Sequence, residues 1–157
     1  MKLVLLVAGL LLSSSALAVQ SPSFEDFLVA EKFEGRPVPP SMSSHQARMF
    51  RTVLRQEASS GPNFAGHFTL ARWGCGAGCI SWAIIDARSG AVWFAPFEVW
   101  DAGGLPDSSL GQHSIEFNIS SELIIANGAL NGKGAGTYYY RWHGGKLSHI
   151  HSIEHKQ

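Results

Sequence analysis

The two cysteines of this chain are the residues with the clearest capacity for chemistry. They are Cys75 and Cys79, and residues 73–79 around them include three glycines. Three residues separate the two thiols, whereas the common redox motif has two. The spacing is open to three interpretations: a structural disulfide, a redox pair, or two thiolate ligands of a metal ion with His67 nearby.

The N-terminus indicates the compartment, which bears on these interpretations. Lys2 gives a positive start, residues 3–12 are mostly apolar, and positions 16–18 read Ala-Leu-Ala. This pattern is typical of a secretory signal peptide at 1–18, cleaved after Ala18. A retained membrane anchor is the alternative, but the apolar stretch is shorter than the roughly 20 residues that span a bilayer. We therefore expect a periplasmic or secreted product without stable membrane insertion.

An oxidising compartment favours a disulfide between Cys75 and Cys79, because exported thiols tend to pair. The intervening glycines help the two Cα atoms approach to the ~4.4–6.8 Å that the bond needs. Such a small ring is expected to shape a local loop more than to hold the fold together. The loop then presents backbone groups to a partner at low entropic cost. The predicted binding residues are Trp73, Gly76, Ala77, Gly78 and His67.

His67 is also a candidate general base, with Asp86 or Glu98 as an orienting carboxylate. The alternative is a strand histidine that makes a structural hydrogen bond. His149 and His151 are the candidate metal ligands, because strand residues two apart share a face. The favoured interpretation is that they are surface histidines on a polar strand, and we predict no cofactor and no resident metal.

Composition limits the classes of partner. The chain has 157 residues with 12 basic and 12 acidic side chains, so no charge excess favours nucleic acid. The length predicts one domain. We expect an extended N-terminal arm over 19–40, where Pro37, Pro39 and Pro40 oppose a helix near its end, followed by a single α+β domain over 41–157.

The hydrophobic pattern predicts the elements that position these residues. Apolar residues recur at helical spacing over 44–58, which predicts one amphipathic helix capped by Ser43 or Ser44. From residue 64 the pattern changes to alternation, and about seven strands are expected, mostly joined by short turns. The glycine-rich stretch 127–136 is predicted to be a hairpin loop. The fold class is therefore α+β: one N-terminal helix packed on a mainly antiparallel, curled or partly closed sheet.

Two blocks carry a resemblance to known proteins. Residues 61–67 read GPNFAGH, and residues 73–79 read WGCGAGC. With Asp86 to Gly90 after them, they resemble a family of small secreted bacterial proteins, over a span from about Phe24 to Trp142. This resemblance implies a domain and a compartment, and no activity.

A weaker likeness is to the periplasmic inhibitor of C-type lysozymes. That family also places a strand, a loop closed by two cysteines and a hairpin in this order. Here the loop is Gly76-Ala77-Gly78, which is one residue shorter and lacks the charged and imidazole groups of the inhibitor. No residue role is carried over from it.

Taken together, the sequence predicts a binding or inhibitor-like module that uses the disulfide-braced loop and an aromatic surface. The expected partner is an envelope or extracellular protein or a glycan, since a catalytic motif is missing from the sequence while aromatic residues are plentiful. The alternative is a metal-dependent or hydrolytic periplasmic enzyme using His67 and Asp86, or the C-terminal histidines.

Overall fold

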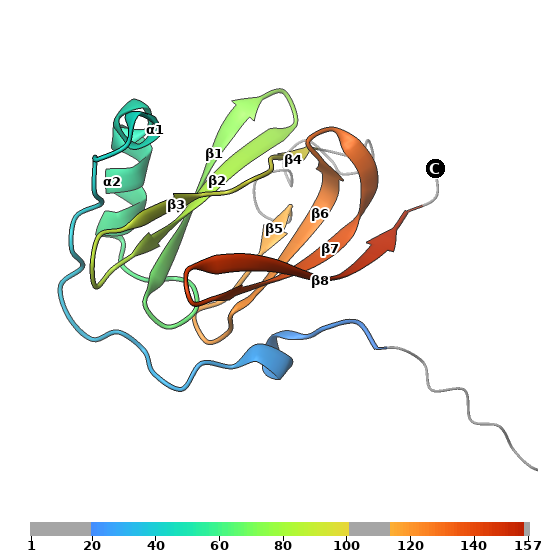
Figure 1. The fold of residues 1–157 in the computed structure, drawn as a ribbon, viewed down its shortest axis with the longest axis horizontal. Coiled ribbons are helices and arrows are strands. Elements are labelled where there is room, and N and C mark those ends of the chain that lie inside the picture. The colour runs from blue at the N-terminus through green and yellow to red at the C-terminus, as the bar shows by residue number, and fades with distance from the viewer. Residues whose placement is uncertain (1–19, 101–113, 156–157) are drawn as a thin grey trace, which may run out of the picture.

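The computed structural model describes residues 20–100 and 114–155 (Figure 1). The predicted signal peptide and its cleavage site lie outside the described residues. No helix within the described ranges is long and apolar enough to cross a bilayer. In chain order the elements are η1 (Phe24–Phe27), α1 (His45–Met49), α2 (Arg51–Ser59), β1 (Phe68–Gly76), β2 (Cys79–Asp86), β3 (Val92–Phe94), β4 (Val99–Trp100), β5 (Ile115–Glu116), β6 (Leu123–Leu130), β7 (Lys133–His143) and β8 (Lys146–Glu154).

The strands form one antiparallel sheet, as predicted. The order is β1-β2-β4-β6-β7-β8, with β3 added to β2 and β5 added to β6. The described residues contain eight strands, whereas about seven were expected. The two-residue strand β4, which pairs with both β2 and β6, is one that the sequence pattern did not predict. The α+β class holds, although sheet dominates.

The sheet is curled and not closed by hydrogen bonds (Figure 1). Side chains bring β7 against β1 and β3 instead: the ring of Trp142 on β7 lies 5.7 Å from that of Phe68 on β1 and 5.3 Å from that of Trp93 on β3. The inner face holds the larger core, with residues such as Leu70, Ile84 and Ile124 almost fully buried. Burial of aliphatic and aromatic side chains on this scale is the main stabilising contribution to such a fold.

The stretch predicted to be one helix contains two short helices, α1 and α2. Ser44 is the cap, since its side chain accepts a hydrogen bond from the Ala47 amide at 3.0 Å. The helix is interrupted at Phe50, whose φ of −99° and ψ of 17° are not helical. The Phe50 ring stacks on Trp73 with centroids 4.8 Å apart, so a tertiary contact accompanies the break. Leu54 of α2 is buried in the second core, between the helix and the outer face of β1 and β2.

The glycine-rich stretch 127–136 is a correction to the sequence prediction. It is mostly strand, with β6 extending to Leu130 and β7 beginning at Lys133, so that the turn contains only Asn131 and Gly132. The glycine at position 128 allows the backbones of β6 and β4 to approach each other closely. A Cβ added at Gly128 would lie 2.3 Å from the backbone oxygen of Trp100, which only a residue without a side chain avoids.

The N-terminal arm lies across the turns at one end of the sheet (Figure 1). Its amides donate to three separate turns: Val29 to the oxygen of Ser120 at 2.9 Å, Phe33 to that of Gly66 at 2.8 Å, and Val38 to that of Ala87 at 2.8 Å. After the short helix η1, residues 28–40 run along the turns at the end of the sheet where the candidate pocket lies.

We expect Gly90→Ala to destabilise the protein more than Gly61→Ala. Both glycines have positive φ, 75° and 85°, so each substitution carries a backbone cost of about 1–3 kcal/mol. A Cβ at Gly90 would also lie 2.3 Å from the oxygen of Pro39 in the arm, whereas nothing lies within 4 Å of one at Gly61. The extra steric cost is about 1–3 kcal/mol. Urea denaturation measures both; equal losses would contradict the packed arm.

Candidate functional site

A pocket of about 360 Å³ lies at the arm-covered end of the sheet. The beginning of β1, the β2–β3 turn, the segment before β6, the β7–β8 turn and the arm all contribute to its wall. Its floor is apolar, formed by Phe68 and Trp142 among others. The ionisable residues that line it are Glu31, His67, Arg88, Glu122 and His143. Pockets with an apolar floor and a few converging polar groups are the usual form of small-ligand sites.

His67 is positioned by the tight turn before β1. Gly66 has a φ of 79°, and the His67 amide donates to the oxygen of Ala65 at 3.0 Å. The imidazole stacks on Phe68 with ring centroids 4.0 Å apart, and its side chain is 22% exposed. Partial burial lowers the pKa of His67, the positive Arg88 nearby lowers it further, and Asp86 opposes both. His67 is therefore neutral near pH 7.

Asp86 lies beside His67 but is mainly a turn residue. Its Oδ1 is 3.9 Å from His67 Nε2, too long for a hydrogen bond. The carboxylate instead accepts from the Arg88 amide at 2.8 Å and from Ser89 Oγ at 2.7 Å. The structure thus brings the predicted pair together without the orienting hydrogen bond of a catalytic dyad. Glu98, the other predicted orienting carboxylate, contacts Ser81 and Cys79 rather than His67.

A better-aligned imidazole–carboxylate pair lies across the same pocket. Glu122 Oε1 is 2.8 Å from His143 Nδ1, and Glu122 Oε2 accepts from Arg141 Nε at 2.7 Å. Because a carboxylate only accepts hydrogen bonds, the proton is on Nδ1 and the Nε2 of His143 is left for other partners. Sequence reasoning missed Glu122, since it lies 21 positions before His143 in the chain. The strand register, which places Leu123 opposite Arg141, is the signal that identifies it.

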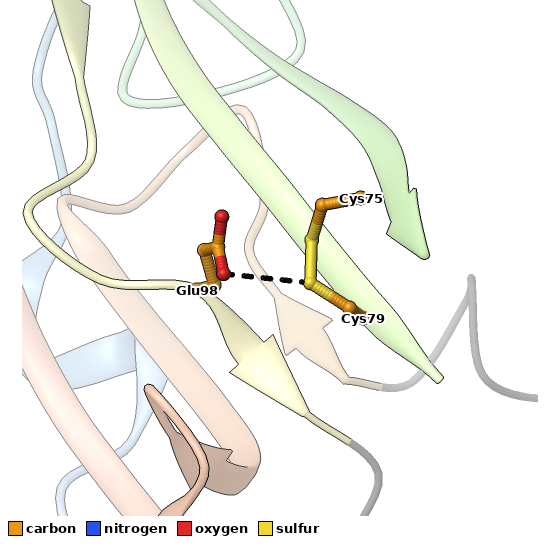
Figure 2. A group of neighbouring side chains, drawn as sticks. All are labelled: Cys75, Cys79 and Glu98. Carbon is orange, nitrogen blue, oxygen red and sulfur yellow. Dashed lines mark hydrogen bonds between the residues drawn. A yellow bond between two sulfur atoms is a disulfide. The ribbon is translucent and has the colours of Figure 1, made fainter. Parts of the chain in front are cut away.

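The predicted disulfide between Cys75 and Cys79 is present, with Cα atoms 5.1 Å apart (Figure 2). It closes the β1–β2 hairpin, whose turn holds the exposed Ala77. Trp73 is not displayed at this tip, because its ring packs against Phe50 and Phe94.

The structure does not bring His67 to the disulfide loop. Eight residues of extended chain separate His67 from Cys75, a distance of about 26 Å. The predicted binding residues therefore belong to two places, at opposite ends of the first hairpin. The interpretation of His67 as a third ligand beside the two thiolates is wrong for the same reason.

The C-terminal histidines do not share a face. Tyr139 pairs with His151 and Tyr140 pairs with His149, so Ile150 is an unpaired bulge residue. Neighbouring strand residues point to opposite faces, and the ring contacts agree: His149 lies against Tyr140, and His151 against Tyr139. The prediction of a shared face for His149 and His151 is wrong, because the alternation of side chains between the two faces is interrupted at the bulge. The sequence does not indicate where this bulge lies.

The aromatic residues mostly fill the core. Tyr138, Tyr140 and Trp142, at alternate positions of β7, share its inner face. Trp100 is the one aromatic residue among those described that stays exposed, at 37%. It pairs with Cys79, so it lies beside the disulfide hairpin. The predicted aromatic surface is thus reduced to a single side chain in the described part of the chain.

Comparisons with family models, with curated proteins and with solved structures find no match to this chain.

The lowered pKa of His67 predicts an acid-side loss of stability. Below its ordinary pKa of about 6.5 the histidine of the unfolded chain takes up a proton before the folded one does. The free energy of unfolding therefore falls as the pH drops from about 6.5 to the lowered pKa of His67, and this contribution is level below it.

Urea denaturation from about pH 7.5 to about pH 5 measures the effect. His67→Gln should flatten this part of the profile, because the amide does not titrate. His151→Gln, on β8, is the matched control. An unchanged profile for His67→Gln would contradict the assignment.

Proposed function

We propose that this protein is a periplasmic or secreted binding module that takes a small anionic ligand in the pocket around His67. The compartment is supported by the Cys75–Cys79 disulfide and by the signal-like N-terminal sequence. The ligand class is supported by the state of the groups in the pocket. Hydrogen-bond donors converge there, and the carboxylates nearby are already engaged.

The carboxylates are engaged as follows. Glu122 accepts from both Arg141 and His143, and Asp86 accepts from its own turn. Glu31 extends into solvent, with 85% of its side chain exposed, and its contact with Arg88 is long, at 3.8 Å. A bound anion therefore meets little competition for the guanidinium of Arg88.

The donors that line the pocket are the Arg88 guanidinium and the imidazoles of His67 and His143. The indole Nε1 of Trp142 has no acceptor among the described residues, but this atom is buried and is not open to the pocket. A carboxylate or phosphate oxygen accepts from donors of this kind, and an attached apolar part suits the lining formed by Phe68 and Trp142.

Binding is expected to strengthen as the pH falls. An anion stabilises the protonated imidazole, so its affinity rises when the pH falls through the pKa of His67, which lies below the ordinary value. Calorimetric titration with benzoate and with inorganic phosphate, at about pH 5.5 and about pH 7.5, measures this. The imidazole NMR signals of His67 and His143 should shift on binding.

Arg88→Gln should weaken binding by about tenfold or more, since a hydrogen bond to a charged group contributes roughly 1.5–3 kcal/mol. The backbone amide of Arg88 holds the turn and is retained in this variant. Arg55→Gln, an exposed arginine on α2, is the matched control. If neither anion shifts the histidine signals at the lower pH, or if Arg88→Gln binds like the wild type, the proposal fails.

A second candidate is a hydrolytic enzyme in the same pocket. The observation that favours it is the 2.8 Å contact between Glu122 and His143 Nδ1, which orients the imidazole and leaves Nε2 for a substrate or water. In this candidate His143 is the general base and Glu122 the positioning residue. His143 and Glu122 thus take the roles of general base and orienting carboxylate that the sequence predicted for His67 and Asp86. Hydrolysis of p-nitrophenyl esters and phosphates that is lost in His143→Gln and kept in His151→Gln would favour it over simple binding.

A further inference from the structure

Glu98 reaches the disulfide from a different part of the sheet. Figure 2 shows its carboxylate, just before β4, directed at the bond between Cys75 and Cys79. Glu98 Oε2 lies 3.6 Å from Cys79 Sγ, and one ligand atom from each of the three residues lies within 4.8 Å of the others. Among the described residues this is the one group of three such side chains close enough to hold a metal ion.

The carboxylate is held in this position. Ser81 Oγ donates to its other oxygen, Oε1, at 3.2 Å. The Glu98 amide donates to Asn131 Oδ1 at 2.9 Å, and the Glu98 carbonyl accepts from the Asn131 amide at 2.9 Å. Both the backbone and one carboxylate oxygen are therefore fixed by neighbours, which leaves Oε2 facing the sulfur. This arrangement resembles the outer hydrogen bonds that orient metal ligands.

In the oxidised protein, the contact between Glu98 and the Cys79 sulfur is not a hydrogen bond. A disulfide sulfur carries no proton, so it does not donate a hydrogen bond to Glu98. The reduced state differs, since two thiolates and a carboxylate form a donor set that suits a thiophilic divalent cation.

We propose that reduction of the Cys75–Cys79 disulfide creates a metal site, in which Cys75, Cys79 and Glu98 bind a divalent cation of the Zn²⁺ class. A dithiol reduces the bond: it supplies two electrons and two protons, the cysteines become thiols, and the dithiol becomes a cyclic disulfide. Binding of the cation then releases the two thiol protons to solvent. Water completes the coordination.

The observed distances suit tetrahedral zinc. With Zn–S of about 2.3 Å and Zn–O of about 2.0 Å, two ligand atoms of such a site lie about 3.5 Å apart for sulfur and oxygen, and about 3.8 Å apart for two sulfurs. The distance between Cys79 Sγ and Glu98 Oε2 is already 3.6 Å. With the Cα atoms 5.1 Å apart, rotation of the cysteine side chains separates the sulfurs by the required amount.

The fold is expected to survive reduction. The hairpin is held by backbone pairing along β1 and β2, from Phe68 opposite Asp86 to Gly76 opposite Cys79. The disulfide closes a ring between residues only four apart, so it restrains little of the unfolded chain. Since the bond and the cation use the same two sulfurs, they exclude each other, and oxidation releases the ion. This inference does not depend on the pocket around His67, which lies at the other end of β1.

The test is an anaerobic titration with Co²⁺, which reports thiolate ligands and tetrahedral geometry by its absorption. The full protein is reduced with dithiothreitol, freed of it by gel filtration, and titrated; the oxidised protein is titrated alongside. We expect the reduced form to saturate with one equivalent of Co²⁺ and to show thiolate charge-transfer bands. Added Zn²⁺ should displace the Co²⁺, and diamide should release it. Absence of saturable binding by the reduced protein overturns the proposal.

Variants assign the ligands. Glu98→Gln should weaken Co²⁺ binding at least about tenfold, because even the outer partners of metal ligands contribute 10–100-fold to affinity. Glu154→Gln, an exposed carboxylate on β8, is the matched control. Glu98→Asp keeps the charge with a shorter reach and provides a second test if Glu98→Gln does not fold. The double variant with serine at both cysteines should lose the thiolate bands. Wild-type affinity in both Glu98 variants excludes the carboxylate and overturns the site.

Discussion

The packing of Trp142 between Phe68 and Trp93 is the contact on which the arrangement of this molecule depends. Within the described residues the sheet does not close through backbone hydrogen bonds, and these side chains bring β7 against β1 and β3 across its inner face. These rings meet edge to face at 5.7 and 5.3 Å, a favourable geometry for aromatic pairs. By joining β7 to β1 and β3, they enclose the inner core and bring the β7–β8 turn next to the turn that carries His67.

The pocket is formed where the contact between Trp142 and Phe68 brings the turns together and the N-terminal arm covers them. Its polar residues come from turns and from segments beside strand ends, where side chains are not committed to the core. The arm then ties three of these turns together through its amides. Because the backbone of every contributing segment is held, the pocket is largely formed without a ligand, which reduces the entropic cost of binding one.

The pocket around His67 and the group of Cys75, Cys79 and Glu98 lie at opposite ends of the first hairpin. At the beginning of β1 are imidazole, guanidinium and carboxylate groups, and at the end of β1 are the two sulfurs with Glu98 (Figure 2). A bound anion and a bound cation are therefore not in competition for the same groups. The sheet between them is well packed, with Leu70, Ala71 and Ile84 almost fully buried, so each end keeps its own geometry.

The sequence by itself determined the features that depend on neighbouring residues. These include the Ser44 cap, the face shared by alternate residues of β7, and the disulfide between residues four apart. Tertiary structure alone decided what depends on register and closure. The bulge at Ile150 separates His149 from His151, Phe50 interrupts the helix, and Gly128 lies in a strand against Trp100. Glu122 meets His143, and Glu98 meets Cys79, across pairings of distant segments. Local spacing does not specify such pairings, because they are set by how a whole sheet buries its inner face.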